Sequence, residues 1–242
     1  RVIVLNTPHN PTGKVFTRDE LEAIAAICRR RDLVVLADQV YEHLVYDDAV
    51  HVPIATLPGM RERTLSLSSA GKLFSVTGWK VGWATGPARL IAATQAAHQF
   101  VTFATATPLQ AAVAFGLSEL GEPFFDEQRA MLASRRDLLA DALTRAGFRV
   151  ALPRGTYFLL AEFSALFDGD DIAFTRDLVE NGGVAAIPPS FFYRDAKDEG
   201  RRLVRFAFCK REETLRQAAE RLSVRWTKKG ASARAPAPPQ EE

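Results

Sequence analysis

The sequence contains little cysteine, little net charge and no long apolar run. Only Cys28 and Cys209 occur among its 242 residues, and neither has His or Cys neighbours at metal-ligand spacing, so neither a zinc site nor a disulfide framework is suggested. This use of cysteine favours a reducing cytoplasm. A formal net charge of +2 does not indicate a nucleic-acid partner. The chain has no run of about eighteen apolar residues, which a membrane span needs, so no membrane partner is indicated.

The first part of the chain reads as a strand, a helix and a second strand. Residues 2–5 and 33–37 are continuous apolar runs of strand length, as expected for strands buried on both faces. Between them, residues 17–20 read Thr-Arg-Asp-Glu, a capping box that predicts the start of a helix. Buried strands joined by a helix predict a parallel sheet in an α/β fold. Asp38 directly follows the second strand, at the edge where open α/β sheets bind ligands.

The later part of the chain predicts helices and then a second domain. Residues 87–120 have an Ala-rich helical pattern interrupted at 105–108, so two helices are expected there. Residues 125–146 form the longest amphipathic stretch, closed by Gly147 as a C-cap, and should carry the chain into the second domain. In that domain we expect strands over residues 148–152, 157–162 and 203–209, and helices over about 171–180 and 211–223.

Residues 64–83 carry two lysines in turns rich in glycine and serine. Residues 64–68 alternate apolar and polar side chains, as a strand does, and then stop at Ser69-Ala70-Gly71. Lys72 follows at once, and Lys80 opens a further predicted strand over residues 80–84. Two lysines in such turns at a strand end indicate an anion site.

Three known motifs can be compared with this stretch. The phosphate loop needs Gly and Ser or Thr at positions where the chain has Ser66 and Leu73, so it does not match. Ser69 and Lys72 match the Ser-x-x-Lys of acylating enzymes, but the accompanying S-D-N and K-T-G elements do not occur. The third motif is a lysine that condenses with an aldehyde cofactor and later moves a proton.

The third motif has a specific counterpart. Residues 69–72 (Ser-Ala-Gly-Lys), Phe74, residues 77–80 (Thr-Gly-Trp-Lys) and residues 82–83 (Gly-Trp) resemble the pyridoxal-phosphate lysine segment of class I/II (fold type I) aminotransferases. The resemblance covers residues 1 to about 225. It implies an α/β fold of the aspartate aminotransferase-like, pyridoxal-phosphate-dependent transferase type, with pyridoxal 5'-phosphate as the cofactor.

The resemblance also implies a domain organisation. Because the family places a long N-terminal portion before the first strand, residues 1–121 are expected to be the C-terminal part of the large cofactor-binding domain. Residues 122–226 would form the smaller α/β domain. Residues 227–242 contain too few apolar groups to pack and are expected to be a disordered tail. No measurable transamination is expected from residues 1–242 alone.

Two charged residues would do the central chemistry if the resemblance holds. Lys72 would bind the cofactor aldehyde and move the substrate proton, as the catalytic residue. Asp38 would pair with the pyridinium nitrogen and keep it protonated. The family segment Asp-Glu-Val-Tyr has Gln39 in place of Glu here, at a position that does not contact the cofactor. The alternative for Asp38 is an ordinary helix N-cap after a strand.

Four further residues match the family's cofactor contacts. Asn10 and Tyr41 match the donors to the phenolic oxygen of the cofactor, and Asn10 also lies near the substrate. The Asn10–Pro11 peptide bond is expected to be cis in this setting. Ser69 and Lys80 match the phosphate ligands, where many relatives have Arg in place of Lys80. Taken alone, Asn-Pro-Thr-Gly at residues 10–13 is simply a turn.

Two residues match substrate contacts of the family. Arg205 is a single charge in an apolar strand, so a partner is expected, and the resemblance implies that it binds the substrate α-carboxylate. The alternative is an edge-strand arginine that faces water. Phe103 corresponds to an aromatic residue contributed to the substrate pocket across a dimer interface. The alternative for Phe103 is a core residue at helical spacing.

The resemblance therefore implies a homodimeric aminotransferase that moves the amino group of an L-amino acid to a 2-oxo acid by a ping-pong Schiff-base mechanism. The relatives suggested by the flanking residues are kynurenine, methionine and N-succinyldiaminopimelate aminotransferases. One alternative within enzymes is a pyridoxal-phosphate-dependent carbon-sulfur β-lyase. Another is a non-catalytic fragment or interaction module.

Overall fold

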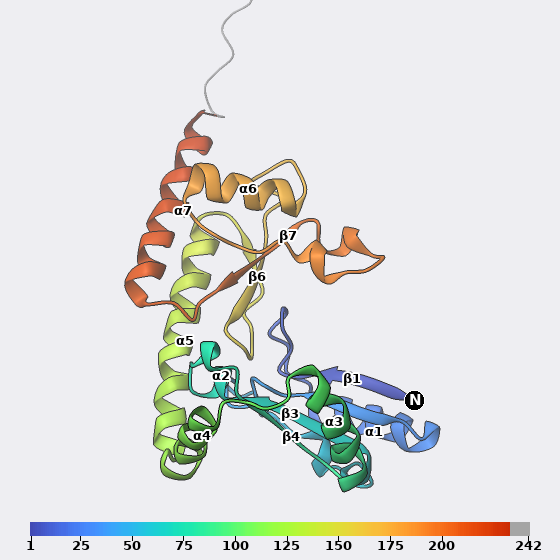
Figure 1. The fold of residues 1–242 in the computed structure, drawn as a ribbon. Coiled ribbons are helices and arrows are strands. Elements are labelled where there is room, and N and C mark those ends of the chain that lie inside the picture. The colour runs from blue at the N-terminus through green and yellow to red at the C-terminus, as the bar shows by residue number, and fades with distance from the viewer. Residues whose placement is uncertain (233–242) are drawn as a thin grey trace, which may run out of the picture. The chain divides into compact units, whose positions relative to one another are not determined.

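The computed structural model describes residues 1–232, apart from the side chains of Lys197 and residues 227–232. Within this part the chain divides into two compact units. The first comprises Arg1–Ala130 together with Arg154–Thr156, and the second comprises Met131–Pro153 and the residues from Tyr157 onward (Figure 1).

Unit 1 contains a mixed sheet in the order β1-β2-β3-β4. Its strands are β1 (Val2–Asn6), β2 (Val34–Asp38), β3 (Thr64–Ser69) and β4 (Gly82–Thr85). The first three are parallel, and β4 is antiparallel to β3. The prediction of a parallel sheet from the apolar runs is confirmed, with the antiparallel β4 at one end.

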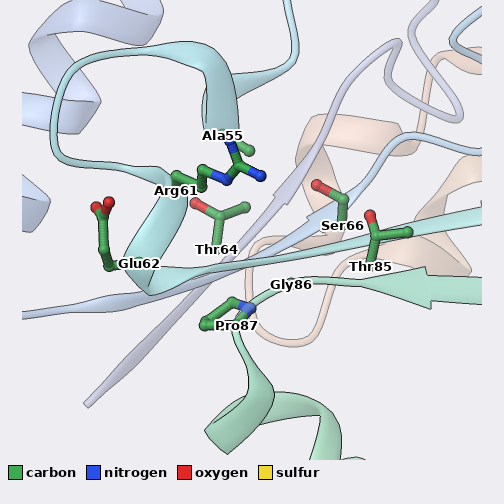
Figure 2. Close-up of a pocket in the computed structure, with 8 residues that line it drawn as sticks. All are labelled: Ala55, Arg61, Glu62, Thr64, Ser66, Thr85, Gly86 and Pro87. Atoms are coloured by element: carbon green, nitrogen blue, oxygen red, sulfur yellow. The ribbon is translucent and has the colours of Figure 1, made fainter.

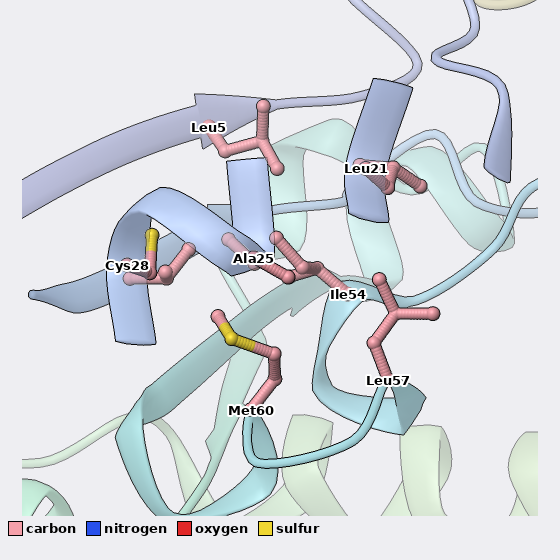
Figure 3. Packing of buried hydrophobic residues seen from close by; sticks show 9 residues of the cluster. Leu5, Leu21, Ala25, Cys28, Ile54, Leu57 and Met60 are labelled. Carbon is pink, nitrogen blue, oxygen red and sulfur yellow. The ribbon is translucent and has the colours of Figure 1, made fainter. Parts of the chain in front are cut away.

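One face of this sheet is covered by helix α1 (Arg18–Arg31). The predicted capping box is present, because Thr17 accepts from the Glu20 N–H and Glu20 accepts from the Thr17 N–H. The core between sheet and helix is made of buried side chains from both elements and from the following 3-10 turns (Figure 3): Leu5, Leu21, Ala25, Cys28, Val35, Ala37, Ile54, Leu57 and Met60. On β1, Val4 is 69% exposed, so its side chain is not covered by described residues.

The predicted helical region is two helices, α3 (Ala88–Val101) and α4 (Thr107–Glu119), with the expected break between them. No residue of α3 is buried within the described chain, and only Val113 and Gly116 of α4 are buried. Large apolar side chains therefore face outward here. No helix of the described residues is long and apolar enough to cross a membrane.

Helix α5 (Glu122–Arg145) contains the division between the units. The predicted boundary lies between residues 121 and 122, whereas the units divide after Ala130. Gly147 follows the helix with φ 97°, as expected for a residue that ends a helix. The short segment 154–156 belongs to unit 1, where Thr156 accepts a hydrogen bond from Tyr46 Oη at 2.6 Å.

Unit 2 contains an antiparallel sheet in the order β5-β6-β7. Its elements are β5 (Arg149–Val150), β6 (Phe158–Glu162), α6 (Asp171–Gly182), β7 (Leu203–Ala207) and α7 (Glu212–Ser232). Phe163, Phe174 and Phe208 are fully buried in this unit. Helix α7 extends through Ser232, so residues 227–232 are helical where the composition predicts a disordered tail. The rest of that predicted tail, residues 233–242, lies outside the described residues.

Candidate functional site

The carboxyl ends of the parallel strands meet at one edge of the large sheet. Asn6 at the end of β1 pairs with Asp38 at the end of β2, and Asp38 pairs with Leu67 of β3. Ser69 is the last residue of β3. Parallel register therefore brings the residues that end these three strands to the edge where α/β sheets bind ligands.

Lys72 is placed at this edge by a short helix that follows β3 directly. This helix, α2 (Ala70–Leu73), begins at Ser69, whose hydroxyl accepts the Gly71 N–H at 3.2 Å. Glycine at position 71 permits close packing, since a Cβ there would lie 3.1 Å from the Cα of Thr77. Because the turn is tight, Lys72 lies only three residues beyond the strand end.

The backbone after Lys80 pairs with the backbone just before Lys72. It follows a 3-10 turn over Thr77–Trp79 and has a left-handed conformation with φ 57°. The next residue, Val81, accepts a hydrogen bond from the Ala70 N–H at 3.1 Å, and Gly82 pairs with Ser69. The prediction that Lys72 and Lys80 share one site is thus supported by the backbone pairing around them.

These charged side chains have few partners within the described residues. The amines of Lys72 and Lys80 form no hydrogen bond or ion pair there. The carboxylate of Asp38 accepts one long hydrogen bond, from the Val40 N–H at 3.4 Å. No helix begins after Asp38, so the N-cap alternative does not hold. Two cations and an anion at one sheet edge are therefore able to bind groups of a ligand.

Asn10 lies in the turn that follows β1. Its N–H donates to Asn6 Oδ1 at 2.9 Å, while Asn6 Nδ2 donates to the Asp38 carbonyl at 3.0 Å. The Asn10–Pro11 peptide bond is cis, as predicted, and the Thr7–Pro8 bond is also cis, which was not predicted. Asn6 thus joins the Asn10 turn to the end of β2. Sequence reasoning missed this role, and its only signal was a polar residue ending an apolar strand.

Tyr41 and Gln39 lie in the turn after β2. Tyr41 is buried, and its carbonyl accepts the Leu44 N–H at 2.8 Å. Gln39 Nε2 donates to Glu42 at 3.1 Å, and Ser68 Oγ donates to the other oxygen of the same carboxylate at 2.6 Å. The amide at position 39 therefore satisfies a part-buried carboxylate. A second carboxylate there would place two anions together.

The histidines form no metal site, because the described residues contain no cluster of three or more metal-ligating side chains. Burial lowers the pKa of His9, whose Nδ1 lies 2.7 Å from Thr12 Oγ1. Burial also lowers the pKa of His51 from 6.5 to about 4, with a smaller effect from the charge of His43. Neither ring nitrogen of His51 has a hydrogen-bond partner.

Unit 1 also contains a cavity of about 550 Å³ (Figure 2). It is lined at the amino end of β3 by Thr64 and Ser66 and at the carboxyl end of antiparallel β4 by Thr85. None of the predicted site residues lines it. Since ligands of open α/β sheets bind at the carboxyl ends of the parallel strands, we assign the candidate site to the edge that carries Lys72.

Arg205 and Phe103 belong to other surroundings. Arg205 lies on β7 in unit 2, where it is half-buried between the buried Val204 and Phe206. Its guanidinium carbon lies 4.0 Å from the ring centroid of Phe158 and 5.1 Å from that of Phe192. Phe103, just after α3, is 84% exposed, so the alternative of a core phenylalanine does not hold in this structure.

Comparison with known proteins gives a consistent family. The family described as aminotransferase class I and II matches residues 1–222. The probable N-succinyldiaminopimelate aminotransferase of Mycobacterium tuberculosis is 48% identical over 231 residues, which cover 93% of this chain and 58% of that protein. A kynurenine–oxoglutarate transaminase of Dictyostelium discoideum is 40% identical, over 92% of this chain and 56% of its own length. The chain thus spans somewhat more than half the length of these relatives.

Solved structures give the same fold. The N-succinyldiaminopimelate aminotransferase of Mycobacterium tuberculosis superposes with a TM-score of 0.89 at 49% identity, over 93% of this chain and 58% of that one. YbdL from Escherichia coli, described as having a methionine aminotransferase function, gives 0.86 at 37% identity, over 93% and 58%. The expected aspartate aminotransferase-like fold is confirmed.

Proposed function

The chain belongs to the class I and II aminotransferase family, and from this premise we propose that it moves the amino group of an L-amino acid to a 2-oxo acid with pyridoxal 5'-phosphate. Lys72, Lys80 and Asp38 carry the proposal, because within the described residues the two amines have no protein partner and the Asp38 carboxylate accepts only one long hydrogen bond. A ping-pong reaction follows, since one amine donor must leave as an oxo acid before the acceptor enters.

The donor set at this edge fits pyridoxal phosphate. The Lys72 amine would hold the aldehyde carbon, and the Asp38 carboxylate would hold the protonated ring nitrogen. Ser69 and Lys80 would bind the phosphate as one neutral donor and one point charge, while Asn10 and Tyr41 would donate to the phenolic oxygen. When bound, the cofactor supplies an electron sink that lets an amino acid lose its α-proton.

The residues themselves have separable tasks. After the donor amino group has displaced Nζ of Lys72 from the aldehyde carbon, the freed lysine amine would accept the α-proton and deliver it to that carbon, as general base and then general acid. The Asp38 carboxylate would keep a proton on the ring nitrogen of the cofactor by charge pairing. Arg205 is proposed to bind the substrate α-carboxylate through parallel hydrogen bonds from its planar fork.

Borohydride trapping tests the assignment. Residues 1–242 with excess pyridoxal phosphate should give one stable phosphopyridoxyl adduct, on Lys72, which Lys72→Ala abolishes and Lys80→Ala leaves in place with weaker cofactor binding. Trapping reports covalent occupancy of the lysine and does not require turnover. An adduct on Lys80 in the unsubstituted chain would overturn these roles.

Two other functions remain to be separated from transamination. A carbon-sulfur β-lyase would use the same lysine but release pyruvate from a cysteine conjugate without added oxo acid. A non-catalytic fragment or interaction module would give no cofactor absorbance and no trapped adduct, even with the family's N-terminal portion supplied. The relatives act on N-succinyldiaminopimelate, kynurenine or methionine according to their names, so a panel of these donors with 2-oxoglutarate would identify the substrate.

We also propose that the protein acts as a homodimer, in the cytoplasm, through the surface of α3 and α4. Large apolar side chains of α3, of α4 and of the segment between them are exposed: Phe100, Val101, Phe103, Phe115 and Leu117. Exposed apolar side chains in such numbers are typical of protein interfaces. Phe100→Asp should shift the sedimentation coefficient from dimer to monomer, whereas Val50→Asp, at an exposed apolar residue elsewhere in unit 1, should not.

A further inference from the structure

Arg205 is held in place by the segments on both sides of its strand. On one side β6 pairs with β7, with Leu160 opposite Arg205. On the other side Ile187 exchanges two backbone hydrogen bonds with Arg205, at 3.0 and 2.9 Å. Each of these two neighbouring segments also supplies an aromatic ring near the guanidinium.

Phe158 comes from β6, and Phe192 comes from the 3-10 turn Pro189–Phe192 that follows Ile187. The guanidinium carbon of Arg205 lies 4.0 Å and 5.1 Å from the two ring centroids. Both distances are within the range of cation–π attraction, about 6 Å. Two rings from two different segments therefore contact one guanidinium.

This arrangement restricts how the guanidinium can bind an anion. A guanidinium is planar, and its N–H groups point outward in that plane, whereas an aromatic ring stacks on its face. Rings that stack on this face would limit rotation of the side chain without themselves occupying the N–H edge. A planar carboxylate binds that edge with two parallel hydrogen bonds.

We propose that Phe158 and Phe192 are positioning residues, which hold the guanidinium of Arg205 so that its N–H edge meets a carboxylate. The proposal rests on the assignment of Arg205 to the substrate carboxylate in the proposed function. Phe192 is the informative residue, since at 47% exposed it is not part of the core and its replacement does not threaten folding.

The first measurement is structural and needs neither cofactor nor turnover. Ring currents from Phe158 and Phe192 should shift the Arg205 Nε–H signal in a proton–nitrogen NMR spectrum, where Arg205→Lys identifies the signal. Phe192→Leu should move this signal toward the position of a solvent-exposed arginine, and Phe192→Tyr should retain the shift. Phe191→Leu is the matched control, because Phe191 is the adjacent residue and is 69% exposed. Equal spectra for the two leucine variants would overturn the proposal that Phe192 positions the guanidinium.

The second measurement is a titration of the same chain with 2-oxoglutarate, read from the Arg205 signal. Phe192→Leu should raise the dissociation constant roughly two- to fivefold over Phe191→Leu, the effect of one exposed cation–π contact. Unchanged affinity in Phe192→Leu would contradict the positioning role. If the unsubstituted chain shows no saturable shift, the carboxylate role of Arg205 in the proposed function fails. The ring-current comparison still decides whether the two rings position the guanidinium.

Discussion

The two units hold their functional charges in different ways. In unit 1, backbone geometry places Lys72 and Lys80, and their amines have no partner within the described residues. In unit 2, aromatic side chains from two neighbouring segments contact the guanidinium of Arg205. A charge placed by the backbone depends on local turn chemistry. A charge placed by side chains depends on contacts that are distant in sequence.

The difference bears on how each site tolerates change. The turn at Lys72 includes a cap and a glycine, and a Cβ at position 71 would crowd Thr77 and the capping Ser69 hydroxyl, which directly flank the lysine turn. The surroundings of Arg205 can lose one ring and keep the strand, because Val204 and Phe206 remain buried on the other face. We therefore expect substitutions in the turn at Lys72 to reduce activity more than the loss of one aromatic ring beside Arg205.

His51 differs from the two lysines of unit 1. Its ring nitrogens also have no hydrogen-bond partner within the described residues, but they are buried rather than open to a ligand. Burial lowers its pKa from 6.5 to about 4, so the folded state keeps the ring neutral. Between these pH values the unfolded chain binds a proton that the folded chain does not. The contribution of the neutral His51 ring to the unfolding free energy is therefore fully present above pH 6.5. It is lost as the pH falls to about 4, by at most about 3 kcal/mol.

Denaturant unfolding at several pH values measures this term. His51→Leu should flatten the loss of unfolding free energy between pH 7 and 4. His98→Leu, at an exposed histidine on α3, should leave the loss as it is. An unchanged pH dependence in His51→Leu would show that the buried ring is not the group that titrates.

Arg205→Lys sharpens the comparison in unit 2. Lysine keeps the charge but cannot form two parallel hydrogen bonds, and the loss of a charge-assisted bond costs about 1.5 to 3 kcal/mol. In the protein that carries the family's N-terminal portion, we expect kcat/KM for the amino donor to fall roughly ten- to a hundredfold, mainly through KM. Arg201→Lys, at an exposed arginine paired with Asp198, is the control. Equal kinetics in the two variants would remove Arg205 from the substrate site.

Local sequence signals predicted the local elements well. The capping box at Thr17 and Glu20 fixed the start of α1, and Gly147 marked the end of α5. The end of α7 was missed because composition alone suggested that residues 227–232 would not pack. The match to family motifs named Lys72 and Asp38, which parallel register then brought to one sheet edge.

Contacts between distant residues could not be predicted in the same way. Nothing in the run 188–193 indicates that Phe192 rather than Phe191 contacts Arg205, because that choice depends on how the turn packs beside β7. The role of Gln39 depends on Glu42 and Ser68, which only folding brings together. Such side-chain contacts are set by tertiary packing, and a single sequence does not carry them.

Asn6 gives the smallest effect and the finest test of backbone placement in unit 1. Its replacement by Ala removes the acceptor of the Asn10 N–H and one donor to the Asp38 carbonyl, which still accepts the Thr7 N–H at 3.1 Å. The substitution removes the hydrogen bond to the Asn10 N–H while the Asp38 carbonyl keeps one donor, so a loss of about 1 kcal/mol in unfolding free energy is expected.

Hydrogen exchange locates that loss. The Asn10 amide should exchange faster in Asn6→Ala, while the Thr7 amide, whose acceptor is unchanged, should change less. Asn181→Ala is the matched control, since that exposed amide donates to Asp177 on the same helix. Equal protection of the Asn10 amide with and without the Asn6 side chain would show that the turn holds its shape alone. The backbone of residues 7–13 would then place Asn10 without help from the end of β2.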